Sequence, residues 1–416
     1  MAEFLAIDRE KSAERIERDV ETLAGPDYTL SSEAIRRYAY TQVYRNTLDY
    51  FTRELEALDF QIEEDPVGTF VARNRPKGTK VFGVGSHCDS NRNGGKYDGT
   101  LGVVTALEVC RLSRELGLDL GLQLMAFVEE EASGFNQGML GSRVAAQWVT
   151  EQDLRELRAI DDGRTFWEHA QEAGYEPERW RESARILDDL SGWIEPHIEQ
   201  GPILDQSGDR IGIVSSIVGY VFGDITVRGR ASHAGGTPMD GRLDAGVVAA
   251  ECILELERMA SAAGHGTVGT VGDIAFSPSL VNAVPGEARF SLDIRSVDED
   301  AFRGVARGIV AFAEEAARRR GMSAEYAERY DAVLPTRMDD RIMKALEEAA
   351  KASGEPYRVI PSRGAHDTQC VAARAPVAMV FVPCKDGVSH SPLEEARPED
   401  AALAAEIILN AIRALV

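Results

Sequence analysis

The sequence predicts an α/β protein with a discontinuous main domain, whose mixed and mostly parallel sheet is flanked by helices, and an inserted α+β domain. Strand-like and helix-like segments alternate between residues 69 and 149, which is the order typical of a parallel sheet covered by helices. From Asp209 to Tyr330 the sequence changes to long β-rich stretches separated by two helical ones. The remaining residues return to helix and strand signals, and we expect them to rejoin the first sheet.

The elements of the main domain follow from the spacing of its apolar residues. The first 60 residues show helical spacing with dense charge, and the segments TFVARNRP and TKVFGVGSH are typical of strands. A helix is expected from about Leu101 to Leu116. The segment LGLQLMAFVEEE alternates as a strand does, and a Gly-rich turn and a second helix from Ser142 to about Val149 follow it.

The inserted domain is expected to contain two passages from strand through helix to strand. Its strands are RIGIVSSIVGYVFGDITVRGRASHAG, ARFSLDIRS and MSAEYAERY, and its helices are RLDAGVVAAECILELERMASAAG and AFRGVARGIVAFAEEAARRRG. APVAMVFVP then supplies a last strand to the main sheet. These patterns predict a first part of the main domain over residues 1–211, an insert over 212–329 and a second part over 330–416.

Composition excludes several classes of function. Of the 416 residues, 69 are acidic and 46 basic, so the net charge of -23 disfavours binding to nucleic acid and to anionic membrane surfaces. Five cysteines without short spacings argue against a disulfide framework and favour a reducing compartment, so a cytoplasmic location is expected. The first residues lack an apolar signal region, and no run of about 18 apolar residues occurs.

The densest chemical signal is the segment GSHCDSNRNGGKYDGTLG. It places His87 at a predicted strand end and Asp98 eleven residues later, with glycines between them that permit tight turns. Imidazole and carboxylate groups are ligands of zinc-type metals. Asp89 is placed to hold the other ring nitrogen of His87 and so to fix its tautomer.

Three glutamates, Glu129 to Glu131, end the next apolar strand, where burial of their charges requires a cation or hydrogen bonds. One of them could bind a metal while a neighbour accepts a proton from bound water. The other histidines of interest are His197 in EPHIEQGP, His390 in DGVSHSPLEEA and His233 in ASHAGGTPMDGRLDA. His169 and His265 have surface-like surroundings, and for His366 both a supporting and a purely structural role stay open.

Taken together, these motifs resemble those of the M20-type metallo-amidohydrolases, specifically the hydantoinase/carbamoylase branch. The resemblance runs in order from about Gly83 to Glu394 and is carried by GSHCDSNRNGGKYDGTLGV, FVEEEASGF, GSR, EPHIEQGPIL, RASHAGGTPMDGRLDA, VNAVPGEARFSLDIRS, AHDTQ and VFVPCKDGVSHSPLE. That branch holds N-carbamoyl-L-amino acid hydrolases, allantoate amidohydrolases and β-ureidopropionases. The resemblance implies that the main domain is catalytic and that the insert is a lid and dimerisation domain, making the protein a homodimer.

The resemblance also implies two divalent metal ions per subunit, zinc or manganese, with cobalt or nickel possible. Asp98 would bridge them, and Glu130 would be the general base. One ion would be held by His87, Asp98 and His197, and the other by Asp98, Glu131 and His390.

On the substrate side, the resemblance implies a small carboxylate-bearing molecule. His233 would stabilise the oxyanion across the dimer interface, and Asn282, Arg295 and Gln200 would contact the substrate. An arginine fork suits the bidentate grip of a carboxylate.

The implied reaction is hydrolysis of the ureido C–N bond of an N-carbamoyl-L-amino acid to amino acid, carbon dioxide and ammonia. Two motifs depart from the family pattern: EEEASGF has Gly134 where arginine is common, and SRGAHDT has Arg363 and Ala365 in place of glycines. Allantoate, and N-acyl amino acids or dipeptides, therefore stay open as substrates. A metal-free binding or regulatory protein is a further alternative, against which the filled ligand positions argue.

Overall fold

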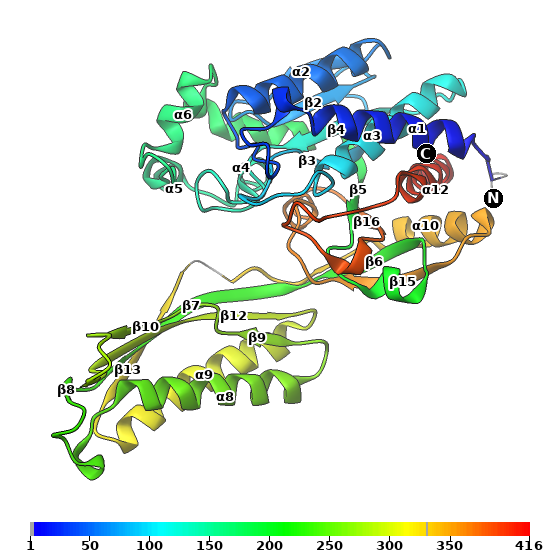
Figure 1. Ribbon diagram of the computed structural model, residues 1–416. Coiled ribbons are helices and arrows are strands. Elements are labelled where there is room, and N and C mark those ends of the chain that lie inside the picture. Colours follow the sequence, from blue (N-terminus) through cyan, green and yellow to red (C-terminus); the bar gives the residue numbers. More distant parts are fainter. Residues whose placement is uncertain (1–3, 330–331) are drawn as a thin grey trace. The chain divides into compact units, whose positions relative to one another are not determined.

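A computed structural model describes residues 4–329 and 332–416, coloured along the sequence in Figure 1. The chain divides into two units. Unit 1 comprises Met1–Ser215, Met338–Ile360 and His366–Val416, and unit 2 comprises Ser216–Arg337 and Pro361–Ala365. The domain boundary expected at residue 330 lies outside the described residues.

The sheet of unit 1 has the order β1-β2-β4-β3-β5-β16-β6, and β15 pairs with β6. β4, β3, β5 and β16 are parallel neighbours, whereas β1, β2 and β6 are antiparallel to theirs. The strands are β1 (Gln61–Glu64), β2 (Phe70–Arg73), β3 (Val81–His87), β4 (Leu122–Phe127), β5 (Leu190–Ile198), β6 (Ile211–Ile217), β15 (Tyr357–Ser362) and β16 (Val377–Val382).

Helices cover this sheet, as the sequence predicts. Ile194 in β5 belongs to the apolar core that includes residues of α1, α3, α10 and α12. Since successive strand residues point to opposite faces, Trp193 and Glu195 point to the other face, where α11 lies. The helices are α1 (Arg9–Leu23), α2 (Gln42–Glu56), α3 (Thr100–Glu115), α4 (Leu140–Ala146), α5 (Glu151–Glu156), α6 (Phe166–Glu172), α7 (Ile203–Ser207), α10 (Asp340–Ser353), α11 (Thr368–Val371) and α12 (Pro398–Leu415).

Capping side chains mark the starts of the first two helices, and three 3₁₀ segments lie between elements of unit 1. Asp8 caps α1 by accepting a hydrogen bond from the Lys11 amide, and Thr41 caps α2 in the same way through the Tyr44 amide. The 3₁₀ segments of unit 1 are Pro26–Tyr28, Pro177–Leu187 and Lys385–Gly387.

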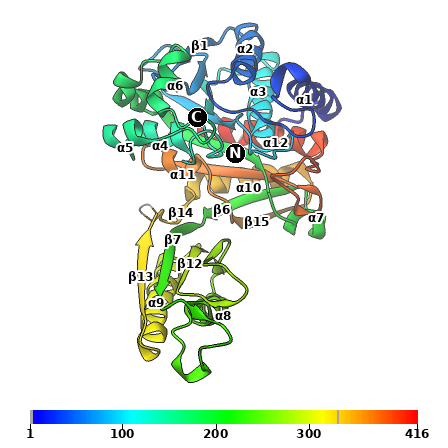
Figure 2. The same ribbon diagram turned by 60° about the vertical axis from the view of Figure 1, so that its left-hand side comes forward.

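Unit 2 is an α+β layer in which α8 and α9 pack on a sheet of the order β10-β12-β7-β13, with β9 paired to β12. Figure 2 shows β7, β12 and β13 together with both helices. All the pairings in this sheet are antiparallel. The elements are β7 (Gly219–Arg228), β8 (Ser232–His233), a 3₁₀ turn (Met239–Gly241), α8 (Ala245–Ala263), β9 (Val268–Thr270), β10 (Ile274–Ser277), β11 (Ala283–Val284), β12 (Glu287–Ser296), α9 (Glu299–Arg319), β13 (Ser323–Glu328) and β14 (Thr336–Arg337).

The predicted fold class is confirmed, with its mixed and mostly parallel central sheet flanked by helices. The helix expected from Leu101 to Leu116 is α3, and the one expected from Ser142 begins two residues earlier as α4. The sequence patterns do not indicate β9 and β10. Their residues are mostly exposed, so no alternation of buried and exposed positions marks them.

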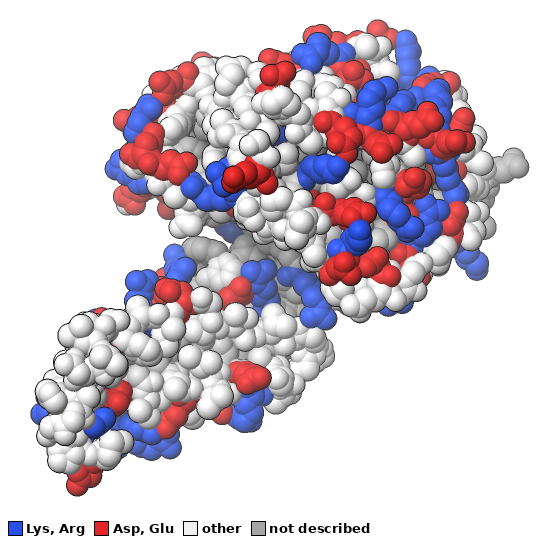
Figure 3. All heavy atoms as spheres, viewed as in Figure 1, with Lys and Arg blue, Asp and Glu red and all other residues white. Residues whose placement is uncertain are grey.

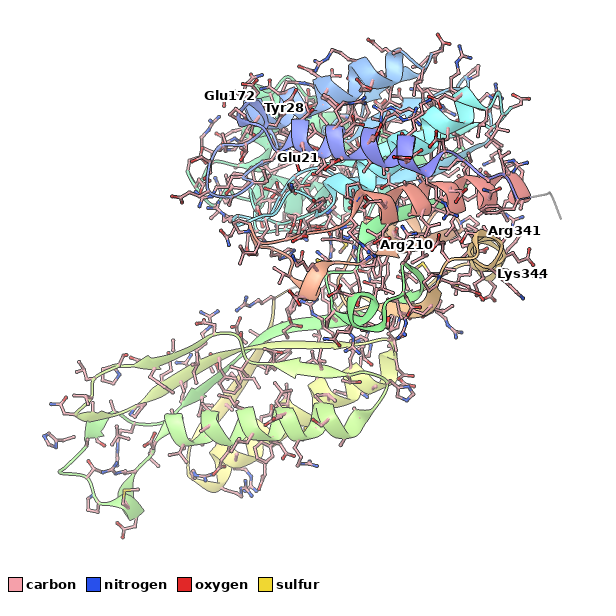
Figure 4. All side chains as sticks on the ribbon, turned by 45° about the vertical axis from the view of Figure 1, so that its right-hand side comes forward. Glu21, Tyr28, Glu172, Arg210, Arg341 and Lys344 are labelled. Atoms are coloured by element: carbon pink, nitrogen blue, oxygen red, sulfur yellow. The ribbon has the colours of Figure 1, made fainter. Side chains whose placement is uncertain are left out.

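Ion pairs join segments that are distant in the sequence. Arg210, labelled in Figure 4, precedes β6 and pairs with Asp400 at 2.6 Å and with Glu355 at 3.1 Å. Glu21 of α1, also labelled there, pairs with Lys96 in the loop between β3 and α3. That loop carries candidate site residues, so α1 helps to hold it in place.

The surface and the cysteines agree with the composition. Figure 3 shows acidic and basic side chains interspersed on the visible face of unit 1. All five cysteines are free and buried, as expected for a chain without a disulfide framework. Among the described residues, no helix combines the length and the apolar character needed to cross a membrane.

Asp65, which follows β1, makes the stability of the fold depend on pH. Burial raises the pKa of its carboxyl group to about 6, against hydrogen bonds from the Thr69 and Val67 amides that lower it. The folded chain then binds more protons than the unfolded chain between about pH 4 and pH 6, so this carboxyl lowers stability as the pH rises through that window.

Near pH 4, the free energy of unfolding of Asp65→Asn is therefore expected to equal that of the wild type or to lie below it. Between pH 4 and pH 7, the free energy of unfolding of Asp65→Asn is expected to rise relative to that of the wild type, by at most roughly 3 kcal/mol. Urea unfolding of both metal-stripped proteins at several pH values measures this gain. A stability difference that does not change with pH would contradict it.

Candidate metal centre

The carboxyl ends of four parallel strands bring the predicted site residues of unit 1 together. His87 ends β3, Glu130 and Glu131 follow β4, and His197 lies near the end of β5. His390 follows β16 after a short loop. Because neighbouring parallel strands end at the same edge of a sheet, these side chains converge there, as the sequence predicts.

One group of possible ligands consists of His87, Asp98 and His197, all buried. His197 Nε2 lies 3.3 Å from Asp98 Oδ1 and 3.5 Å from His87 Nε2. His87 Nε2 also lies 3.8 Å from Glu130 Oε2. The three donor groups thus face one another closely enough to share an ion.

A second group consists of Asp98, Glu131 and His390. His390 Nε2 lies 3.1 Å from Asp98 Oδ2 and 3.4 Å from Glu131 Oε2. Asp98 therefore presents one oxygen to each group. His390 is 47% exposed, whereas the Asp98 side chain is 3% exposed, so this group lies at the solvent side.

Gly99 permits the close approach of Asp98 to His87. It has φ 61°, which side chains rarely adopt, and a Cβ atom there would lie within 2.5 Å of the His87 ring. Gly99 is also the residue at the start of α3. The glycine is thus required both by the turn and by the packing of the histidine.

Asp89 is fully buried and holds the segment after β4. Its Oδ1 and Oδ2 accept hydrogen bonds from the backbone amides of Glu130 and Glu131, at 3.1 and 3.0 Å. Its Oδ1 also lies 3.5 Å from Nδ1 of His87, which makes a 3.2 Å contact with the Asp89 carbonyl oxygen. The carboxylate thus touches both strand ends, beyond the histidine contact that the sequence suggested.

Burial and the close approach of several acidic groups shift the pKa values of the residues in this cluster. Burial raises the pKa of Glu130 and Glu131 well above its usual range, and the charge of Asp98 raises both further. Asp98 behaves in the opposite way: although burial opposes its ionisation, the hydrogen bond from His390 and the charges of His197 and His87 hold its pKa below the usual value. Burial lowers the pKa of His197.

Gln200 follows β5 with φ 56° and points into the same cluster. Its Nε2 donates to both carboxylate oxygens of Asp98 at 3.1 Å and lies 3.4 Å from His390 Nε2. Of the predicted substrate contacts, Gln200 is the one that unit 1 contains.

Two buried residues in this cluster were not assigned a role from the sequence. The His366 ring packs edge-on against that of His197 with centroids 4.6 Å apart, and burial lowers its pKa well below the usual value. Glu195 forms a third donor group with these two histidines, yet its oxygens accept hydrogen bonds from Ser86 and Thr368. An acidic residue within a buried strand, two positions before His197, was the signal that could have indicated Glu195.

The remaining predicted residues lie in unit 2. His233 in β8 pairs with Ala283 in β11, and the Ala234 amide donates to the Asn282 carbonyl, so this short ladder brings His233 and Asn282 together. Both side chains are exposed. Nδ1 of His233 accepts from the Gly235 and Gly236 amides, which leaves Nε2 to face outward.

Arg295 lies in β12 of unit 2. It pairs with Asp293 at 2.9 Å and lies over the rings of Tyr220 and Phe222. Its Nη1 donates at 3.4 Å to the carbonyl oxygen of Arg363, one of the residues at which the sequence departs from the family pattern. The guanidinium of Arg363 forms no ion pair with any residue in the described parts of the chain, and its side chain is exposed.

Comparison with known proteins identifies relatives over nearly the whole chain. The model of "Peptidase family M20/M25/M40" matches residues 83–414. The N-carbamoyl-L-amino-acid amidohydrolase of Paenarthrobacter aurescens is 36% identical over 97% of this chain and 98% of its own length. The ureidoglycolate hydrolase of Oryza sativa subsp. japonica is 32% identical over 92% of this chain and 80% of its own length.

A solved structure of similar fold is an amidase of the hydantoinase/carbamoylase family from Burkholderia phymatum. It aligns with a TM-score of 0.85 at 27% identity and covers 100% of both chains.

Proposed function

The chain belongs to peptidase family M20/M25/M40 and is a hydrolase of linear amides, and we propose that it hydrolyses the ureido C–N bond of N-carbamoyl-L-amino acids. The observation that carries this proposal is the pair of donor groups that share Asp98. The relatives named as amidohydrolases of carbamoyl amino acids and of ureidoglycolate support a ureido acid as the substrate.

The donor set suits two divalent ions. Three carboxylates, those of Asp98, Glu130 and Glu131, lie close together in a buried place. Oε1 of Glu131 is buried and has no hydrogen-bond partner among the described residues. Buried charges of one sign are costly unless a cation compensates them. Imidazole and carboxylate donors suit zinc and manganese alike.

We assign the ligand roles as the resemblance implies. His87 and His197 would hold one ion, Glu131 and His390 the other, and Asp98 both. Such ions lower the pKa of bound water and polarise the amide carbonyl. Asp89 would orient His87 and fix the positions of the Glu130 and Glu131 backbones.

Glu130 is assigned as the general base. Its carboxylate lies beside His87 but belongs to neither donor group, so it is free to take a proton from the attacking water and return it to the leaving nitrogen. Gln200 is assigned as a polar contact to the substrate.

In unit 2, we assign Asn282 and Arg295 to the substrate carboxylate and His233 to the oxyanion. The outward-facing Nε2 of His233 suits donation to an oxyanion, and a guanidinium stacked on two rings is held in one orientation. We also propose that unit 2 is the lid through which the chain forms a homodimer. Exposed apolar residues of α8 and β10 support this: Val247, Leu254, Ile274 and Phe276. Light scattering that finds a fully active monomer would contradict the dimer.

The function is tested by ammonia release from a panel of N-carbamoyl-L-amino acids, N-carbamoyl-β-alanine, ureidoglycolate and allantoate, with Mn²⁺ supplied. Turnover of the carbamoyl amino acids that depends on Glu130 is the expected result. Release of amino acid from N-acyl substrates, without turnover of any ureido acid, would replace the proposed substrate class by N-acyl amino acids.

Arg363 is expected to make the protein prefer, within this panel, substrates that carry a second carboxylate. The Arg363 main chain adjoins Arg295, the proposed carboxylate contact, and the exposed Arg363 side chain adds a positive charge to this part of unit 2. Arg363→Gly is expected to lower kcat/KM for N-carbamoyl-L-aspartate about tenfold, which corresponds to roughly 1.4 kcal/mol, and to change that for N-carbamoyl-L-asparagine by less than about twofold. Equal losses on both substrates, measured under the same salt conditions, would contradict the bias.

A further inference from the structure

We propose that Glu394 is a positioning residue that holds the two candidate ligands Asp98 and His390 in register. This inference rests on the proposed metal-dependent function. It concerns a buried carboxylate that touches the loops of both ligands and that neither donor group includes.

The first contact of Glu394 is with the backbone of Asp98 itself. Its Oε1 accepts hydrogen bonds from the amides of Tyr97 and Asp98 at 2.8 and 2.9 Å. Glu394 is 4% exposed, so water does not compete for these bonds. The position of the Asp98 main chain therefore depends on a residue 296 positions away.

The second contact of Glu394 runs through Ser389, the residue before His390. The Ser389 hydroxyl lies 3.1 Å from Glu394 Oε2 and 3.2 Å from Asp98 Oδ2. Its single proton is shared between the two carboxylates. One side chain thus links the loop of Asp98, the carboxylate of Asp98 and the loop of His390.

Glu394 packs directly against Gly95. A Cβ atom at Gly95 would lie 2.4 Å from the Glu394 Cβ and 2.6 Å from its Oε1. The absence of a side chain at Gly95 therefore allows Glu394 to occupy its position. A methyl group there would displace the carboxylate without changing any charge.

The physical consequence is specific to metal binding. Asp98 Oδ2 and His390 Nε2 lie 3.1 Å apart on chain segments that covalent structure leaves independent. If Glu394 sets the spacing of these two atoms, its loss raises the free-energy cost of arranging Asp98 and His390 around an ion. Residues that support metal ligands in this way typically contribute 10–100-fold to metal affinity or activity.

Asp65 provides a matched control. It too is a buried carboxylate whose oxygen accepts from two backbone amides, those of Val67 and Thr69, but it lies in the turn between β1 and β2 and belongs to no donor group. Asp65→Ala therefore removes the same kind of backbone anchor. Any difference from Glu394→Ala reports the connection to the ligands.

The experiment measures Zn²⁺ dissociation constants by competition with a chromophoric chelator, together with the Tm of each metal-free protein. Glu394→Ala and Gly95→Ala are expected to weaken Zn²⁺ binding about 10–100-fold at one site or both, because Asp98 belongs to both donor groups. Asp65→Ala is expected to leave the Zn²⁺ affinity unchanged. Glu394→Gln is expected to stay within about threefold of wild type, because its Oε1 still accepts from both amides and its Nε2 can donate to the Ser389 oxygen.

Each remaining outcome has a distinct meaning. Unchanged Zn²⁺ affinity in folded Glu394→Ala, with a lowered Tm of the metal-free protein, would show a role in the fold alone and overturn the inference. The same loss of affinity in Asp65→Ala would overturn it too, because the effect would then be general. A wild-type protein that binds no Zn²⁺ or Mn²⁺ would overturn the proposed function itself and the inference with it.

Discussion

Glu130→Gln is expected to reduce kcat by about 10²–10⁴-fold while leaving the metal content unchanged. Glutamine keeps the shape of the side chain but cannot accept the proton of the attacking water. Glu130 belongs to neither donor group, and its backbone amide donates a hydrogen bond to Asp89. The substitution is therefore expected to leave the metal ligands in place. Steady-state kinetics on the best substrate of the panel, with metal analysis of the same samples, measure this result.

The pattern of the kinetic change distinguishes a base from a binding residue. A lost base lowers kcat and kcat/KM equally, whereas a lost contact to the substrate raises KM with kcat unchanged. Gln200→Ala serves as the comparison, since Gln200 is assigned to substrate contact and its loss is expected mainly in KM. Wild-type kcat in Glu130→Gln would remove Glu130 from the mechanism.

Asp98→Ala is expected to abolish both of the proposed metal sites at once, with activity reduced by more than about 10³-fold. Asp98 Oδ1 lies near His197 and Asp98 Oδ2 lies near His390. Among the described residues, Asp98 is the one that belongs to both of these donor groups. Metal analysis after gel filtration is expected to fall from two ions per chain to near zero. Circular dichroism would establish that the variant is folded.

His390→Ala is the matched comparison for Asp98→Ala. It belongs to one donor group only and is half-exposed, so it is expected to lose one ion and to keep the other. If Asp98→Ala and His390→Ala retained the same number of ions, Asp98 would not be the shared ligand.

The sequence was enough to predict the fold class and the members of the cluster in unit 1. His87 and the glutamates after β4 were placed at strand ends by apolar runs that stop there, and His197, Asp98 and His390 were added by ordered motifs. These features are local: each depends on a few neighbouring residues, which a single sequence displays directly.

Asp89 could be identified from its spacing to His87, but local patterns could not assign roles to Glu394 and His366, because those roles depend on contacts over long sequence separations. Glu394 binds the Asp98 amide across 296 positions, and the His366 ring meets that of His197, which lies far earlier in the sequence, in β5. The exposed strands β9 and β10 left no periodic signal for the same reason: their pairing with β12, rather than burial, defines them.

The sequence by itself thus determined which chemical groups this protein possesses and on which strand ends they lie, because apolar periodicity and motif spacing are properties of neighbouring residues. Only the tertiary structure decided how closely these groups approach one another and which distant residues hold Asp98 in place. Those relations depend on the order of strands in the sheet and on buried hydrogen bonds between distant segments, and neither follows from the local preferences of the chain.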